Sequence, residues 1–273
     1  MQQVTKLAFL GALLVGVFMM WDRIIDNMVF HPTPGADLAP ADVGLAGEDV
    51  FLATADGVRI HAFWLPAAGA TRAVLFLHGN AGNASHRLPN AAELVRLGTS
   101  VLLLDYRGYG RSEGRPSEAG VYADAQAGLE YLIAERAIAA DRIVVFGRSL
   151  GGAVAIDLVQ RQSVAGLILE STFTSLSDMA GSLIPFAGSV TGGRYDSERK
   201  IADIETPLLF FHGDRDELVP FALGQRLFAA ANEPKAFETI RGAGHNDTTL
   251  VGGAAYFMRL GRFLDAVVPP GAP

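Results

Sequence analysis

Short, almost wholly apolar runs alternate with amphipathic segments through most of the chain, and this alternation limits the possible folds more than any other feature. The runs are typical of strands covered on both faces and lie at residues 73–77, 101–104, 143–146, 166–169, 208–211 and 236–240. Helical patterns fall between most of them, at 88–97, 121–135, 150–161, 221–231 and 254–267. Strand and helix in alternation build a parallel sheet, so we predict an α/β fold.

An antiparallel hairpin is expected ahead of this pattern, from strands at 49–52 and 59–65 that flank an Asp-Gly turn. The sheet then has about eight strands, mostly parallel, with helices on both faces. A length of 273 residues, half of them apolar, fits a single large domain. Residues 171–207 are too many for a simple crossover, and we interpret them as a small cap insertion.

A serine stands at the turn between one strand and the next helix. Ser149 is the centre of the motif Gly147-Arg148-Ser149-Leu150-Gly151, directly after the run 143–146. Glycines two positions to either side allow a sharp turn that exposes the hydroxyl at the end of the sheet. This context indicates a nucleophile.

A serine hydroxyl needs a base and an acid to become a nucleophile, and the sequence supplies both in order. Asp216 follows the strand at 208–211, and His245 lies in a glycine-rich loop after the last strand. Asp214 competes with Asp216, but we interpret Asp214 as stabilising its turn. Asp105 also ends a strand; we expect it to cap the amides of the turn at 107–108 and not to act as a nucleophile.

An acyl-transfer site also needs backbone N–H groups directed at the oxyanion. Leu150, the residue after the nucleophile, is one expected donor. Asn80, in the glycine-containing loop after residues 73–77, is the other.

These motifs resemble the α/β-hydrolase superfamily, and most closely its Bem46-like, membrane-anchored serine hydrolases, which are similar to the ABHD13 and ABHD17 type. The resembling stretches are 77–83, 105–114, 147–152, 169–175, the Asp216 segment and 244–245. The resemblance implies an α/β-hydrolase fold with Ser149, Asp216 and His245 as a catalytic triad. It further implies hydrolysis of carboxylic esters or thioesters of small acyl or lipid-like substrates.

The N-terminus contains an unbroken run of apolar residues and glycines at 7–21. We predict an uncleaved membrane anchor at residues 1–27, formed by a single transmembrane helix, followed by the hydrolase domain at 28–273. A cleaved signal peptide and a buried core helix are the alternatives. Lys6 ahead of the run favours a cytoplasmic N-terminus, with the catalytic domain on the periplasmic or extracellular side; cleavage would give a secreted enzyme.

Composition excludes several other functions. The net charge of −7 comes without a basic cluster, which argues against nucleic acid as a partner. Cysteine is absent. His78, His86 and His212 form no zinc pattern and are expected to serve loop hydrogen bonding. The glycine-rich stretch at 108–113 lacks the third glycine of a dinucleotide-binding motif, and no Gly-x-x-x-x-Gly-Lys motif occurs, so no metal or cofactor is implied.

The same fold leaves other functions open. A peptidase, a hydrolase of carbon–carbon bonds, or a non-catalytic binding protein remain alternatives. Apolar residues in the cap interval favour an acyl chain; they are Met179, Leu183, Ile184, Pro185, Phe186, Ala187 and Val190.

Overall fold

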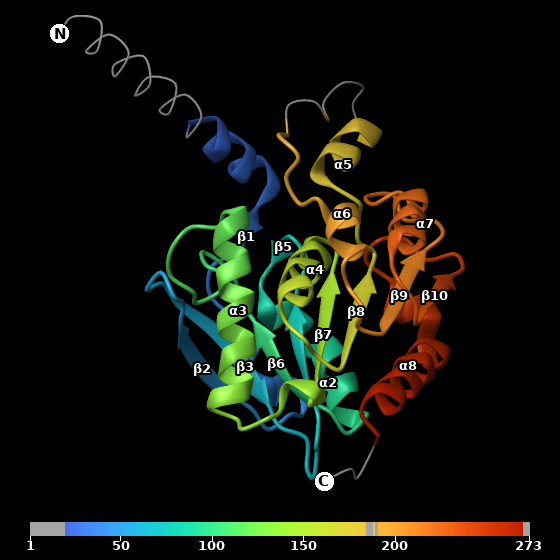
Figure 1. Ribbon diagram of the computed structural model, residues 1–273. Helices are drawn as coiled ribbons and strands as arrows, with labels where there is room; N and C mark the ends of the chain where they lie inside the picture. Colours follow the sequence, from blue (N-terminus) through green and yellow to red (C-terminus); the bar gives the residue numbers. More distant parts are fainter. Residues whose placement is uncertain (1–19, 184–187, 189–190, 270–273) are drawn as a thin grey trace, which may run out of the picture.

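The computed structural model describes residues 20–183, 188 and 191–269 of the chain. Its described part contains an eight-stranded sheet in the order β10-β9-β8-β7-β4-β6-β3-β2 (Figure 1). The strands are β2 (Glu48–Ala53), β3 (Arg59–Leu65), β4 (Ala73–Leu77), β6 (Ser100–Leu104), β7 (Ile143–Arg148), β8 (Gly166–Glu170), β9 (Leu208–Gly213) and β10 (Lys235–Ile240). The strands β2 and β3 pair antiparallel, as do β3 and β6, and the other neighbours are parallel. The predicted α/β fold is confirmed.

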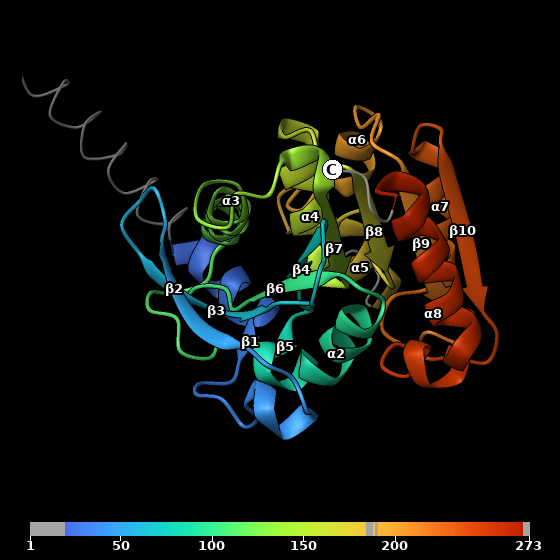
Figure 2. The same cartoon turned by 90° about the horizontal axis from the view of Figure 1, so that it is seen from below.

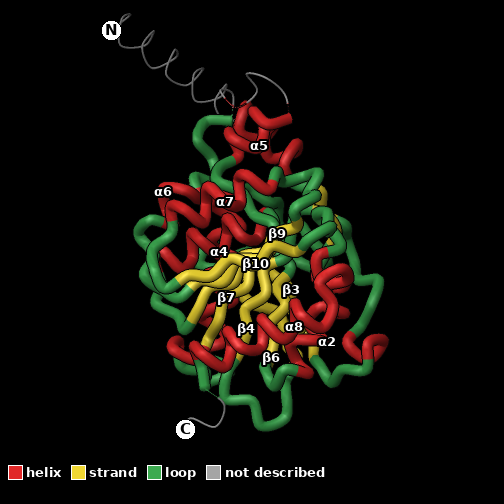
Figure 3. The backbone as a smooth tube through the Cα atoms, turned by 90° about the vertical axis from the view of Figure 1, so that its right-hand side faces the viewer, coloured by secondary structure: helices red, strands yellow, loops and turns green. Residues whose placement is uncertain are grey.

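Helices cover both faces of the sheet (Figures 2 and 3). One face carries α3 (Glu118–Ala134), α4 (Leu150–Arg161), α6 (Ser197–Ile201) and α7 (Phe221–Ala230), and the other carries α2 (Leu88–Arg96) and α8 (Thr248–Val267). Alternate residues of each strand divide between the two cores: in β4, Leu75 packs toward α3 and Phe76 toward α2. Short elements complete the described chain, namely β1 (His31–Pro32), β5 (Ala81–Gly82), α5 (Leu176–Leu183), η1 (Pro40–Val43), η2 (Ala84–Arg87) and η3 (Ala140–Arg142).

The strand order creates a switch point between β4 and β7. After β4 the chain runs through α2 on one face, whereas after β7 it runs through α4 on the other face. The loops at the carboxyl ends of these two neighbouring strands therefore diverge, and ligands bind at such a point in open α/β sheets. The predicted oxyanion loop follows β4, and the predicted nucleophile follows β7.

Helix α8 begins at Thr248, six positions before the start predicted from the pattern. A kink explains the difference: Gly253 has φ +50° and ψ −138°, so two helical pieces join there. The amphipathic pattern is continuous only beyond the kink, where the prediction placed its start.

The interval predicted as a cap contains α5 and α6. Of its apolar residues, Met179 packs against the main core. The side chain of Leu183 and the residues Ile184, Pro185, Phe186, Ala187 and Val190 lie outside the described residues.

The first described residues, 20–29, are helical. The predicted domain boundary after residue 27 falls inside this helix, and most of the predicted anchor lies outside the described residues. Within the described part of the chain, no helix has the length and apolar character needed to cross a membrane.

Candidate active site

Ser149 occupies a strained turn between β7 and α4. Its φ of 53° lies in the left-handed region, which costs a residue with a Cβ on the order of 1–3 kcal/mol. The flanking glycines make the turn possible, because a Cβ at Gly147 would lie 2.3 Å from the carbonyl oxygen of Gly151, and one at Gly151 would lie 2.1 Å from that of Leu77. The turn thus packs the start of α4 directly onto the end of β4.

The structure brings Ser149, His245 and Asp216 together. The Oγ of Ser149 lies 3.1 Å from Nε2 of His245, and Nδ1 of His245 lies 2.8 Å from Oδ2 of Asp216. Both contacts are satisfied by one tautomer, in which Nδ1–H donates to the carboxylate and Nε2 accepts from the serine hydroxyl. Three elements supply the side chains: the β7–α4 turn, the loop after β9 and the loop after β10.

The carboxylate of Asp216 is fixed from several sides. Its Oδ1 accepts the backbone N–H groups of Leu218 at 3.0 Å and Val219 at 2.8 Å, and His212 lies 3.4 Å from Oδ2. Burial opposes ionisation, but hydrogen bonds from His212 and His245 outweigh it and hold the pKa of Asp216 well below its usual range. The group is therefore an anion at neutral pH.

Asp214 has a different role. Its Oδ1 accepts the N–H of Gly242 at 2.6 Å, which ties the loop after β9 to the loop after β10. The prediction that Asp214 stabilises its turn is consistent with this contact.

The loop after β4 lies against the nucleophile. A Cβ at Gly79 would be 3.4 Å from Cβ of Ser149, which places the Asn80 backbone beside the serine. The hydroxyl of Tyr109 donates to the Asn80 carbonyl at 2.7 Å, and Oδ1 of Asn80 accepts the N–H of His31 at 3.1 Å. These contacts leave the Asn80 N–H unused within the described residues. Its role as an oxyanion donor with Leu150 stays a prediction.

The expected role of Asp105 was wrong. Its carboxylate is buried and accepts the N–H of Ala84 at 2.7 Å while lying 2.9 Å from Nδ1 of His61, and the N–H of Arg107 donates instead to Asp124. Burial opposes its charge, but the hydrogen bond from His61, the nearby imidazole of His78 at 3.7 Å and the Ala84 amide together lower the pKa of Asp105 to about 2. His61 on the adjacent strand draws the carboxylate inward, a pairing that local turn chemistry does not reveal.

His78, His86 and His212 form hydrogen bonds to loop residues, as predicted, and the partner of His86 is Asp37. Nδ1 of His78 bonds to the Gly79 carbonyl at 2.7 Å, and Nε2 of His212 bonds to the Val219 carbonyl at 3.0 Å. In the described ranges no three histidine or carboxylate side chains are grouped as a metal site.

Sequence reasoning missed two charged residues beneath the site. Arg148 and Glu170, at the ends of β7 and β8, form a buried ion pair of 2.9 Å. The sequence contained a signal for this pair, since each of the two charged residues stands at the end of an otherwise apolar strand.

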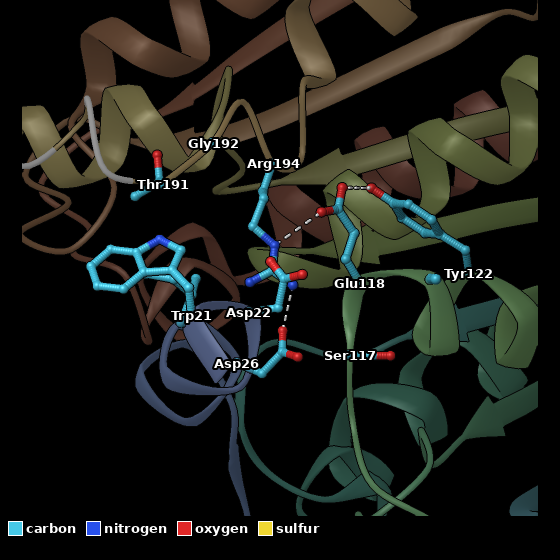
Figure 4. Close-up of a pocket in the computed structure, with 11 residues that line it drawn as sticks. Trp21, Asp22, Asp26, Ser117, Glu118, Tyr122, Thr191, Gly192 and Arg194 are labelled. Atoms are coloured by element: carbon cyan, nitrogen blue, oxygen red, sulfur yellow. Dashed lines mark hydrogen bonds and ion pairs between the residues drawn. The ribbon is translucent and has the colours of Figure 1, made fainter. Parts of the chain in front are cut away.

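A cavity of about 510 Å³ lies away from these residues, between the helical residues 20–29, the start of α3 and residues 191–194 (Figure 4). Arg194 links its walls: Nη2 donates to Asp26 at 2.6 Å, and Nε lies 3.4 Å from Glu118. Ser149, His245 and Asp216 are not among the residues that line it. The contacts of Arg194 with Asp26 and Glu118 across this cavity therefore attach the helical residues 20–29 to the domain.

Comparisons with known proteins agree with this architecture. A family model described as "Serine aminopeptidase, S33" matches residues 68–195. An uncharacterized protein of Mycobacterium tuberculosis is 40% identical over 242 residues, covering 87% of this chain and 86% of its own. WAV2 of Arabidopsis thaliana, an alpha/beta hydrolase domain-containing protein, is 39% identical, covering 89% and 88%. Protein bem46 of Schizosaccharomyces pombe is 37% identical, covering 82% and 79%.

Solved structures share the fold. An esterase of Pyrococcus furiosus superposes with a TM-score of 0.74 at 23% identity, covering 87% of this chain and 98% of its own. A puromycin-hydrolyzing peptidase of Mycobacterium tuberculosis superposes with a TM-score of 0.68 at 19% identity, covering 87% and 41%. Both esterases and peptidases are thus built on this architecture.

Proposed function

The chain belongs to the Bem46-like family of α/β-hydrolases, and from this we propose that it is a serine hydrolase that cleaves carboxylic esters or thioesters of acyl substrates. The observation that carries the proposal is the continuous hydrogen-bonded line from Ser149 through His245 to Asp216. Such a line is the arrangement that turns a serine hydroxyl into a nucleophile.

The mechanism follows from the direction of these bonds. His245 Nε2 takes the proton of Ser149 as Oγ attacks the acyl carbonyl, and the N–H groups of Asn80 and Leu150 bind the oxyanion. His245 then gives the proton to the departing alcohol or thiol as the carbon–heteroatom bond breaks. Water, deprotonated by His245, attacks the acyl-enzyme, and His245 returns the proton to Oγ of Ser149 as the Oγ–acyl bond breaks and the acid leaves. Asp216 stabilises the imidazolium in both halves.

Reaction with a fluorophosphonate probe tests the proposal. We expect one adduct, on Ser149, in the folded protein and none in Ser149→Ala. Absence of an adduct from the wild type, or an undiminished adduct in the variant, would refute the serine-hydrolase assignment.

Peptide hydrolysis is the second candidate, favoured by the description of the matched family model. A panel of p-nitrophenyl esters of rising acyl length, run beside aminoacyl p-nitroanilides, separates the two. We expect ester turnover to exceed anilide turnover, with the optimum at acyl chains longer than acetyl. Preferred anilide turnover would reassign the substrate class.

We also propose that the N-terminus tethers the domain to a membrane. The helical residues 20–29 bury Ile25 and continue into a buried Phe30, but Met20, Ile24 and Met28, one turn apart, are 60%, 43% and 68% exposed. This exposed stripe is continuous in sequence with the apolar run at 7–19. An amphipathic helix of this kind lies at a membrane interface with its apolar face toward the lipid.

A further inference from the structure

Arg148 has a side chain that reaches away from the nucleophile turn toward the loop that holds the base. It is the residue before Ser149 and is only 5% exposed. Its Nη2 donates to the backbone carbonyl of His245 at 2.6 Å and to Oδ1 of Asn246 at 3.1 Å, and its Nε donates to Oε1 of Glu170 at 2.9 Å. One guanidinium therefore connects the nucleophile turn directly to the histidine loop.

Glu170 holds this guanidinium in place and is itself fully bonded. Its Oε1 also accepts the hydroxyl of Thr248 at 2.9 Å, and its Oε2 accepts the hydroxyl of Tyr256, both from α8. Its backbone carbonyl accepts the N–H of Ser149 at 2.8 Å. Glu170 thus contacts the nucleophile through its backbone and the histidine loop through Arg148 and α8.

The loop after β4 meets the same guanidinium. A Cβ at Gly79 would lie 3.7 Å from Nη1 of Arg148, so the backbone beside Asn80 rests close to it. The three loops that carry the nucleophile, the base and the predicted oxyanion donor converge on one buried cation.

We propose that Arg148, oriented by Glu170, is a positioning residue that sets the distance between His245 and Ser149; the inference rests on the proposed serine-hydrolase function. A buried guanidinium must keep its partners, because leaving a buried charge unpaired is strongly unfavourable. Its planar fork satisfies Glu170 and the His245 carbonyl together in only a narrow range of geometry. The loop carrying the base is therefore held where Nε2 reaches Oγ.

The test compares Arg148→Gln and Arg148→Lys with Arg72→Gln. Arg72 is a matched control because it is equally buried, at 6% exposed, and also has a carboxylate partner and backbone carbonyl partners; these are Asp265, Val268 and Leu97. It differs in position, since it precedes β4 and lies at the opposite end of the sheet from Ser149. For Arg148→Gln we expect the rate of fluorophosphonate labelling and kcat for a p-nitrophenyl ester to fall about 100-fold, with KM within about threefold, because misplacing a reacting group by 1 Å costs that much.

The expected results for the other variants separate positioning from general stability. Arg72→Gln lowers the melting temperature but keeps labelling and kcat within about threefold of wild type, whereas Arg148→Lys, which keeps the charge but lacks the fork, loses about 10-fold. Wild-type labelling of Arg148→Gln, or an equal loss in Arg72→Gln, overturns the inference. If Arg148→Gln does not fold, Arg148→Lys decides in the same way. A wild-type protein that does not react at all instead refutes the proposed function.

Discussion

Asp214 and Asp216 stand two positions apart in one loop, yet their carboxylates have different partners. Asp216 bonds to Nδ1 of His245, and Asp214 bonds to the backbone of Gly242. We predict that Asp216→Asn lowers kcat by about 10³- to 10⁴-fold, because an amide no longer supports the required imidazole tautomer. Asp214→Asn is the matched control, and its kcat should stay within about threefold of wild type. Steady-state kinetics with a p-nitrophenyl ester measures both, and the reverse ranking would exchange their roles.

Asp105 gives a prediction about stability. Its pKa falls from an ordinary 3.8 to about 2 in the folded protein, so the charged form is favoured by folding. The contribution is about 2 kcal/mol, fully present above pH 4 and lost as the pH falls through 2. We expect the difference in unfolding free energy between wild type and Asp105→Asn to shrink by about 1 kcal/mol between pH 6 and pH 3. Urea unfolding at each pH measures it, and a difference independent of pH would contradict the explanation by hydrogen bonding to the carboxylate.

At the scale of elements, the nucleophile turn depends on close contact between backbones. A Cβ at Gly151 would meet the carbonyl oxygens of Leu77 and His78 at 2.1 and 2.6 Å, and both lie at the end of β4, which is held by its neighbours in the sheet. We predict that Gly151→Ala destabilises the protein by about 1–3 kcal/mol or more and slows probe labelling of Ser149.

Gly181 in α5 is the control for this substitution. It has open space around an added Cβ, so Gly181→Ala should be neutral or stabilising by up to about 1 kcal/mol. Thermal unfolding of both variants is the measurement. Equal effects at the two glycines would show that backbone entropy, not the contact with β4, governs the turn.

The sequence predicted most of these elements because their signals are local. Every strand of the main sheet was expected within two residues of its observed bounds, and α4 was expected at its observed limits. Ser149, Asp216 and His245 were predicted from their motifs and their order in the chain. What local patterns do not contain is pairing across the sheet: His61 with Asp105, and Arg148 with His245, are separated by 44 and 97 positions. The kink at Gly253 was missed because the spacing of apolar residues does not indicate the backbone torsion angles of a single residue.

At the scale of the whole molecule, the N-terminal helix lies at the end of the sheet toward which β7 and β8 point, the end that carries Ser149 (Figure 1). It is fastened there by the ion pair between Asp26 and Arg194 and by the edge-to-face contact of Phe30 with Tyr109. The start of the described helix, residue 20, therefore has a fixed position relative to the site. Under the proposed membrane attachment, the lipid surface and the nucleophile are on the same side of the domain.

Deletion of residues 1–19 tests this arrangement, because it removes the apolar run and keeps the docked helix. We expect the full chain to stay in the membrane fraction after alkaline extraction and the shortened chain to be released. Turnover of a soluble short-chain ester should be equal in the two proteins, since the helix still packs on the domain. Turnover of a long-chain ester carried in vesicles should fall at least 10-fold in the shortened chain, because tethering raises the local concentration of membrane substrate. A shortened chain that remains membrane-bound would refute the anchor; equal turnover of the vesicle substrate would refute the proposed orientation.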